Sequence, residues 1–264
     1  MALRLEVLES VPEAGERRPH PLLFVHGAWH GAWCWQPHFM PWFSARGYHC
    51  HAVSLRGHGE SEGAERLRST RIRDFMSDIR RVGDELGSPV VIAHSLGALA
   101  LRLLLEDWRP AAAILLCPYM REANSRWLKE LLPRHVGRVL GALMTGNPYL
   151  LVCNHAVARQ LFFSKDMSEE QASQWTARLQ NESFFTFMEM LRGLSSRPER
   201  VTTPMLVVSA EHDALFAPES HEVLARRYRA DFRFLPDLAH DAMLDTRWEV
   251  AARCVFDWLD QRGL

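Results

Sequence analysis

Ser95 lies between a run of apolar residues and a run of small, helix-forming residues. Residues 89–94 read Pro-Val-Val-Ile-Ala-His, and residues 96–101 read Leu-Gly-Ala-Leu-Ala-Leu. The pattern predicts a strand, a sharp turn and a helix with the serine hydroxyl at the apex, close to the G-x-S-x-G elbow but with Ala93 in place of the first glycine. Because a helix N-terminus behind the hydroxyl favours negative charge, Ser95 is a candidate nucleophile.

A candidate acid and a candidate base follow two later strand-like segments. Asp213 comes after the apolar run 205–210, and His240 comes after the run 232–235. A serine hydroxyl needs a base within hydrogen-bond reach, and histidine has a suitable pKa. Asp213 would hold the imidazole in the correct tautomer. Glu211 and Asp237 are rivals for the acid, but Asp213 is favoured because it lies further into the loop after a strong strand.

The third segment of interest is a strand that runs into small residues at 26–28, His-Gly-Ala. A turn of this kind next to the nucleophile can offer a backbone N–H to an oxyanion. We therefore expect an oxyanion hole formed by the N–H groups of Ala28 and Leu96. His26 is expected to brace the loop by hydrogen bonds to the backbone, and the segment 56–59 is interpreted as scaffold.

The motif H-G-A-W-H-G-A-W-C-W at residues 26–35, together with the Ser, Asp, His order, resembles the α/β-hydrolase superfamily. It is particularly similar to the branch that contains plant methyl esterases, hydroxynitrile lyases and related bacterial esterases. The resemblance covers nearly the whole chain. It implies an α/β-hydrolase fold, a mostly parallel sheet flanked by helices with a helical cap insertion. We expect residues 1–120 and 202–264 to form the core and residues 121–201 the cap, or lid.

Alternating strand and helix patterns support this fold class. The expected strands cover 3–9, the first being an antiparallel edge strand, then 21–25, 49–54, 89–93, 112–116, 204–209 and 231–234. The expected helices cover 36–46, 70–86, 96–107, 217–229 and 246–261. Between 121 and 201 the pattern is entirely helical, and residues 168–171, Ser-Glu-Glu-Gln, resemble a capping box.

The amino-acid composition and the lack of ligand motifs are typical of a globular protein that binds neither nucleic acid nor a metal. The chain has 264 residues, 47% of them hydrophobic, and a formal net charge of −1, which argues against a nucleic-acid partner. Its five cysteines are scattered, so we expect reduced thiols and a cytoplasmic location. No signal-peptide pattern, membrane span, metal-ligand spacing or phosphate-binding loop is found. No cofactor or metal is expected, and no oligomeric state is assigned.

Apolar side chains in the expected cap indicate a substrate pocket with few charges. Trp127, Leu128, Leu131 and Leu132 are among these side chains, and many of the whole set are expected simply to join the cap to the core. The candidate pocket residues are Trp29, His94, Phe162, Phe184, Leu215, Phe216 and Met243.

These features predict a serine hydrolase that cleaves a small to medium apolar carboxylic ester through an acyl-enzyme. A hydroxynitrile or C–C lyase could use the same triad, but the resembling lyases carry threonine and lysine where Ala28 and Asp241 stand here. A dehalogenase or epoxide hydrolase would need a carboxylate in place of Ser95. A ligand receptor with very slow turnover is the remaining alternative.

Overall fold

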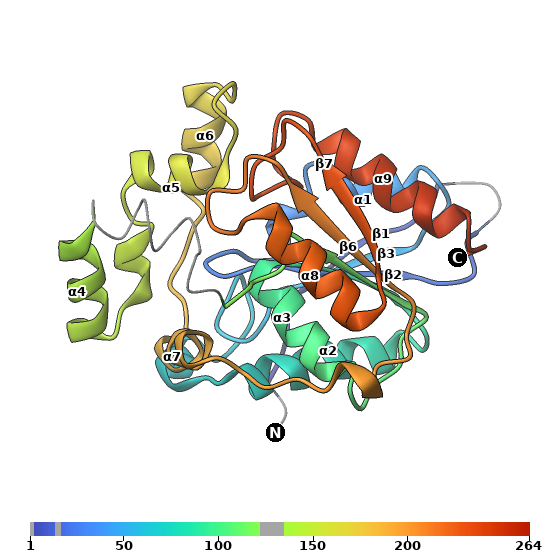
Figure 1. The fold of residues 1–264 in the computed structure, drawn as a ribbon, viewed down its shortest axis with the longest axis horizontal. Helices are drawn as coiled ribbons and strands as arrows, with labels where there is room; N and C mark the ends of the chain where they lie inside the picture. The colour runs from blue at the N-terminus through green and yellow to red at the C-terminus, as the bar shows by residue number, and fades with distance from the viewer. Residues whose placement is uncertain (1–2, 14–16, 122–134) are drawn as a thin grey trace.

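Short apolar segments form one sheet at the centre of the molecule (Figure 1). The computed structural model describes residues 3–13, 17–121 and 135–264. Within them the sheet has seven strands in the order β1-β3-β2-β4-β5-β6-β7. Only β1 is antiparallel to its neighbour; the other pairs are parallel. The mostly parallel sheet and the antiparallel edge strand confirm the expected α/β-hydrolase fold.

The strands lie close to the ranges expected from the sequence. They are β1 (Val7–Ser10), β2 (Leu22–Val25), β3 (Cys50–Val53), β4 (Val90–His94), β5 (Ala112–Leu116), β6 (Met205–Ala210) and β7 (Asp231–Leu235). Strands β2 to β6 are buried along their whole length, as expected for strands covered by helices on both faces.

The prediction was wrong at the start of β1, which begins at Val7 rather than at residue 3. Its partner β3 ends at Val53, so the residues before Val7 meet a loop instead of a strand. The Ser54 N–H donates to the Glu6 carbonyl at 3.0 Å, and the Glu62 N–H donates to the Arg4 carbonyl at 3.0 Å. The backbone is thus paired without forming a regular ladder.

Successive side chains of each strand point to opposite faces and so build two cores. Leu22 and Phe24 of β2 belong to the first core, and Leu23 and Val25 belong to the second. The first core is covered by α1 (Phe39–Ser44) and α9 (Trp248–Asp260). The second is covered by α2 (Ile72–Glu85), α3 (Ser95–Leu104) and α8 (Pro218–Tyr228). All five expected core helices are present, with ends one to three residues shorter in most cases.

The described part of the chain between β5 and β6 contains helices and no strand. The helices are α4 (Val136–Thr145), α5 (His155–Phe162), α6 (Glu169–Thr176) and α7 (Phe184–Arg192). In Figure 1, α4, α5 and α6 lie together on the side towards which the arrows of β6 and β7 point. The Ser168 hydroxyl caps α6 by accepting a hydrogen bond from the Gln171 N–H at 3.2 Å.

Residues 122–134, which include Trp127, Leu128, Leu131 and Leu132, lie outside the described residues. The division of the chain at residues 121 and 201 therefore stays a prediction. Among the helices of the described ranges, none is long and apolar enough to cross a membrane.

Candidate active site

Ser95 occupies the sharp turn between β4 and α3. Its φ angle is +47°, a left-handed value that is unfavourable for a residue with a side chain. Strain of this kind at a single turn residue is characteristic of functional sites. A side chain on Gly97, two residues later, would collide with the His26 carbonyl oxygen. The small residue after the serine is therefore needed for the contact between α3 and the end of β2.

The turn at residues 26–28 packs directly against this elbow. A Cβ atom on Gly27 would lie 2.6 Å from Nδ1 of His94 and 3.0 Å from Cβ of Ser95. Within the described residues, the Ala28 N–H donates no hydrogen bond. Leu96 is in the first turn of α3, where an N–H has no acceptor in its own helix. Two backbone donors are thus available beside Ser95.

The structure brings Ser95, His240 and Asp213 into one hydrogen-bonded chain. Nε2 of His240 lies 3.0 Å from Oγ of Ser95, and Nδ1 lies 2.8 Å from Oδ2 of Asp213. The other carboxylate oxygen of Asp213 accepts hydrogen bonds from the N–H groups of Leu215 (2.8 Å) and Phe216 (3.0 Å). These backbone donors fix the carboxylate, and the carboxylate in turn orients the imidazole.

Burial and charge act in opposite directions on this pair. Burial by itself would lower the pKa of His240, but the charge and the hydrogen bond of Asp213 outweigh it and raise the pKa above its usual value. Burial would likewise raise the pKa of Asp213, and the neighbouring His240 instead holds it below its usual value. Asp213 is therefore ionised at neutral pH and stabilises a proton on His240.

Glu211 and Asp237, the other two candidates for the acid, make hydrogen bonds and ion pairs with groups other than His240. Oε2 of Glu211 accepts a hydrogen bond from the Asp237 N–H at 3.0 Å. The exposed carboxylate of Asp237 pairs with Arg247 at 3.4 Å and lies 3.8 Å from His212. Neither of these contacts involves His240.

A second buried carboxylate, Asp241, lies near the His240 imidazole. Its Oδ2 is 2.9 Å from Nε2 of His30, and its Oδ1 is 3.7 Å from Nε2 of His94. Burial would raise the pKa of Asp241, but His30, followed by His94 and His240, holds it below its usual value. This pairing was not predicted from the sequence. The only signals were a carboxylate next to the candidate base and a histidine inside the 26–35 motif.

His94 is a neutral bracing residue in this arrangement. Burial lowers its pKa to about 3, and the nearby His240 imidazole acts in the same direction. Its Nε2 lies 3.0 Å from the His240 carbonyl oxygen, so the Nε2–H donates to that carbonyl. The predicted pocket residue His94 therefore touches the backbone of the candidate base and the carboxylate of Asp241.

Aromatic rings surround the His240 imidazole. The ring centroids of Phe216 and Phe162 lie 5.6 Å and 6.2 Å from that of His240, and Trp29 lies 6.0 Å from Phe162. The predicted pocket residues Leu215 and Met243 are also buried in the same core cluster.

Phe184, at the start of α7, is not part of this ring group. It lies beside Phe185, at 6.4 Å between ring centroids, and 5.9 Å from the Arg68 guanidinium. Within the described residues, no ring contact links it to His240.

Two loops next to Ser95 are braced as the sequence suggested. Nδ1–H of His26 donates to the Gly27 carbonyl at 2.8 Å, and Nε2 accepts from the Leu55 N–H at 3.0 Å. Burial, followed by the nearby His58, lowers the pKa of His26 well below its usual value. His26 is therefore neutral and joins the loops that follow β2 and β3.

The segment before α7 is attached to the same two loops. The Gln180 N–H donates to the Trp29 carbonyl at 2.9 Å, and its side-chain oxygen accepts from the Gly59 N–H at 2.9 Å. The Glu182 carboxylate lies 3.3 Å from Nε2 of His58 and accepts from the Trp29 N–H at 3.3 Å. Charge and hydrogen bonding thus hold Trp29 against the helical segment.

Residues 22–253 match the model of the family described as "Alpha/beta hydrolase family". Over 94 residues, 34% of this chain, the sequence is 31% identical to Methylesterase 3 of Arabidopsis thaliana, and the match spans 35% of that protein. A solved thermophilic esterase from Thermogutta terrifontis is similar with a TM-score of 0.74 and 17% identity over 99% of this chain and 95% of that one. The enol-lactonase from Burkholderia xenovorans LB400 gives 0.74 and 19% over 98% and 97%. At these identities the structural likeness establishes the fold alone.

Proposed function

The chain belongs to the alpha/beta hydrolase family, and on that premise we propose that it is a serine hydrolase acting on small to medium apolar carboxylic esters. The observation that carries the proposal is the continuous chain of hydrogen bonds from Ser95 through His240 to Asp213. In this proposal Ser95 is the nucleophile, His240 the general base and Asp213 the group that orients it.

The proposed reaction begins when Oγ of Ser95 attacks the ester carbonyl carbon and its proton moves to Nε2 of His240. The backbone N–H groups of Ala28 and Leu96 hold the oxyanion of the tetrahedral intermediate. His240 then passes the proton to the departing alkoxide, which leaves as an alcohol and gives an acyl-enzyme. Water, deprotonated by His240, attacks the acyl carbon; the proton returns to Oγ of Ser95 and the acid is released.

The surroundings of the imidazole support an apolar substrate. Phe162, Phe216 and Trp29 contribute rings next to the candidate base. The buried charges, Asp213 and Asp241, are paired with histidines and would not face an acyl chain directly. Methylesterase, esterase and enol-lactonase in the names of similar proteins agree with an ester or lactone bond as the target.

The proposal also covers the cap and the cellular location of the protein. We take residues 121–201 as a cap over the site, supported by the contacts of Gln180 and Glu182 with Trp29 and by the position of α4 to α6 in Figure 1. The scattered cysteines of the sequence support a cytoplasmic location.

Hydrolysis of p-nitrophenyl esters of graded acyl length tests the proposed function. Ser95→Ala should lower kcat by about 10⁴–10⁶, because only binding and oxyanion contacts would remain. A fluorophosphonate probe should label Ser95 in the wild type. Ser173→Ala, an exposed serine on α6, is the matched control and should keep full activity and labelling. Labelling of a different serine that persists in Ser95→Ala would refute the assignment.

A second arm separates an esterase from a hydroxynitrile lyase. A lyase must stabilise departing cyanide, and a cation beside the base would serve that purpose. Here Asp241 places a buried carboxylate next to His240. We therefore expect ester hydrolysis and no mandelonitrile cleavage above background. Mandelonitrile cleavage that depends on Ser95, with esters inert, would favour the lyase; a burst of one equivalent without turnover would favour a receptor.

A further inference from the structure

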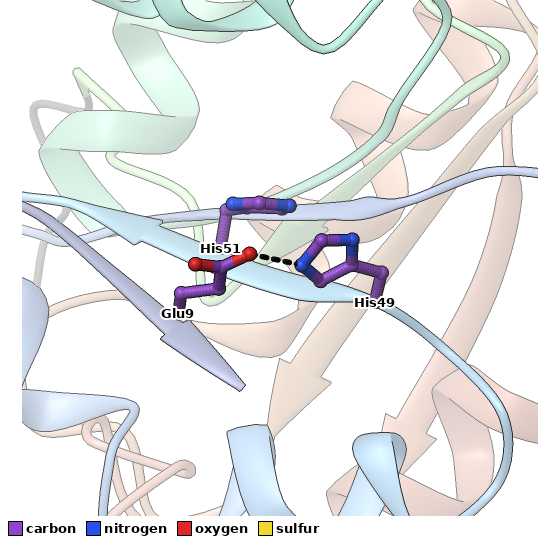
Figure 2. Close-up of side chains that lie close together, drawn as sticks. All are labelled: Glu9, His49 and His51. Carbon is purple, nitrogen blue, oxygen red and sulfur yellow. Dashed lines mark hydrogen bonds and ion pairs between the residues drawn. The ribbon is translucent and has the colours of Figure 1, made fainter. Parts of the chain in front are cut away.

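The outer strands of the sheet gather a carboxylate and two imidazoles at one place (Figure 2). β1 and β3 are antiparallel, and their register sets Glu9 directly opposite His51. His49 lies two residues before His51, directly ahead of β3, and Figure 2 shows its side chain beside those of Glu9 and His51. One ligand atom from each of these three side chains lies within 4.8 Å of the others.

His51 is the buried member of this group, and one of its nitrogens has no partner. The side chain is only 8% exposed, and its Nε2 makes no hydrogen bond in the part of the chain that the structure describes. A buried polar atom without a partner is unfavourable, and a bound ion or water is one explanation for such an atom in a native structure. A neutral imidazole has a lone pair on one ring nitrogen, and such a nitrogen is a common metal ligand.

Glu9 and His49 form the open side of the group. Nε2 of His49 lies 2.5 Å from Oε1 of Glu9, and the side chains are 35% and 53% exposed for His49 and Glu9 respectively. The centroids of the two imidazole rings are 4.2 Å apart. The group is therefore open to solvent at Glu9 and His49 and includes the buried imidazole of His51.

We propose that Glu9, His49 and His51 form a binding site for a divalent transition-metal ion of the zinc type. Two imidazole nitrogens and one carboxylate oxygen suit Zn²⁺, Ni²⁺ or Cu²⁺ and are a poor set for Mg²⁺ or Ca²⁺, which prefer oxygen ligands. Water would complete the coordination. Binding requires both imidazoles to be neutral, and the ion replaces the hydrogen bond between His49 and Glu9.

The site would be structural and independent of the proposed hydrolysis. His51 is the second residue of β3, near the end of the sheet where the parallel strands begin, whereas Ser95, Asp213 and His240 follow strand ends on the opposite side. The ion would link the edge strand β1 to its single neighbour β3. The sequence shows no metal-ligand spacing here because His49 and His51 supply only two donors, and the third, Glu9, comes from a different strand.

Titration of tag-free protein with ZnCl₂, followed by calorimetry and by thermal melting, tests the site. We expect saturable binding that raises the Tm, and we expect Glu9→Gln, His49→Gln and His51→Gln each to weaken Zn²⁺ affinity by at least about tenfold. Since His51 is buried, its variant can fail to fold. Glu9→Gln and His49→Gln change side chains that are partly exposed, so these two variants should fold. Their Zn²⁺ affinities decide the test if His51→Gln does not fold.

His212→Gln is the matched control, because His212 is exposed and belongs to a separate group with Glu211 and Asp237. It should bind Zn²⁺ as the wild type does. Absence of saturable binding in the wild type, or wild-type affinity in Glu9→Gln and His49→Gln, would overturn the proposal. Loss of binding in His212→Gln instead would assign the ion to the other group and also overturn it. Ester hydrolysis by the three variants should stay at the wild-type level, so this test and that of the proposed function fail separately.

Discussion

Two fully buried carboxylates, Asp213 and Asp241, lie near His240, and they are held in different ways. Asp213 accepts two backbone hydrogen bonds, from Leu215 and Phe216, in addition to its bond with the imidazole. Asp241 pairs with His30, and within the described residues no backbone N–H donates to its carboxylate.

This difference in hydrogen bonding suggests that one carboxylate positions the His240 ring and the other acts on it through its charge. A carboxylate fixed by peptide N–H groups cannot rotate freely, so Asp213 defines where Nδ1 of His240 must point. Asp241 has no hydrogen bond to the His240 side chain and acts on it through its charge, which raises the pKa of His240. We therefore expect Asp213 to control the geometry of the base and Asp241 to adjust its proton affinity.

Of the Asp→Asn substitutions at these carboxylates, Asp213→Asn should lower activity the most. The amide can no longer hold the imidazole in the required tautomer, so kcat should fall by about 10³–10⁴. Steady-state kinetics with a p-nitrophenyl ester measures the loss, and circular dichroism checks that the variant is folded. A folded variant that keeps more than a tenth of the wild-type kcat would mean that Asp213 is not the orienting acid.

The pH dependence of the wild type should report the charge on His240. The base must be neutral, so kcat/KM should rise with pH through the pKa of His240. That pKa is raised, which places the midpoint above the ordinary value of about 6.5. Two pH units below the midpoint, the rate should be lower by about 100-fold. His94, with a pKa of about 3, stays neutral and should add no step between pH 5 and 9. A profile that is flat down to pH 5 would contradict this assignment of the base.

Much of the fold and the hydrogen-bonded chain could be predicted because the signals are local. The apolar run before Ser95 and the small residues after it define the elbow without any distant partner. Asp213 and His240 each follow a strand, and parallel strands bring their carboxyl ends to one edge of the sheet. The start of β1 was misjudged, since its pairing depends on where β3 ends.

The contacts that the sequence analysis missed depend on residues far apart in the chain. Asp241 meets His30 only after β2 and β7 take their places in the sheet, and neither residue stands in a recognisable spacing with the other. Glu9 and His51 become neighbours only through strand register. Phe184 was expected in the pocket because it is an apolar residue of the cap; its ring lies 5.9 Å from the Arg68 guanidinium, and its place in a pocket stays a prediction.

Asp241→Asn tests the charge effect and should be milder than Asp213→Asn. Removing the negative charge should lower the pKa of His240, so the acidic limb of the kcat/KM profile should move to lower pH. A base of lower pKa accepts the serine proton less readily, and one pKa unit is a tenfold change in proton affinity. On the plateau above this limb, where His240 is neutral, we therefore expect kcat to fall by about tenfold or less. A merely structural role would lower activity without moving the limb. An upward shift of the limb would contradict the charge argument.

Asp237→Asn should have the smallest effect of the three Asp→Asn substitutions, because Asp237 lies outside the candidate active site. Asp237 is a carboxylate in the loop before His240, but its side chain is 61% exposed and its charged partner is Arg247. Exposed ion pairs contribute less than about 1 kcal/mol, so both kcat and Tm should stay close to the wild type, with kcat changed by less than about threefold. The position of the acidic limb should also stay the same, because Asp237 is not among the groups that act on His240. Suppose that Asp237→Asn abolished activity while Asp213→Asn did not. The carboxylate that orients His240 would then be Asp237, in the loop after β7, and Asp213 would no longer be the positioning residue.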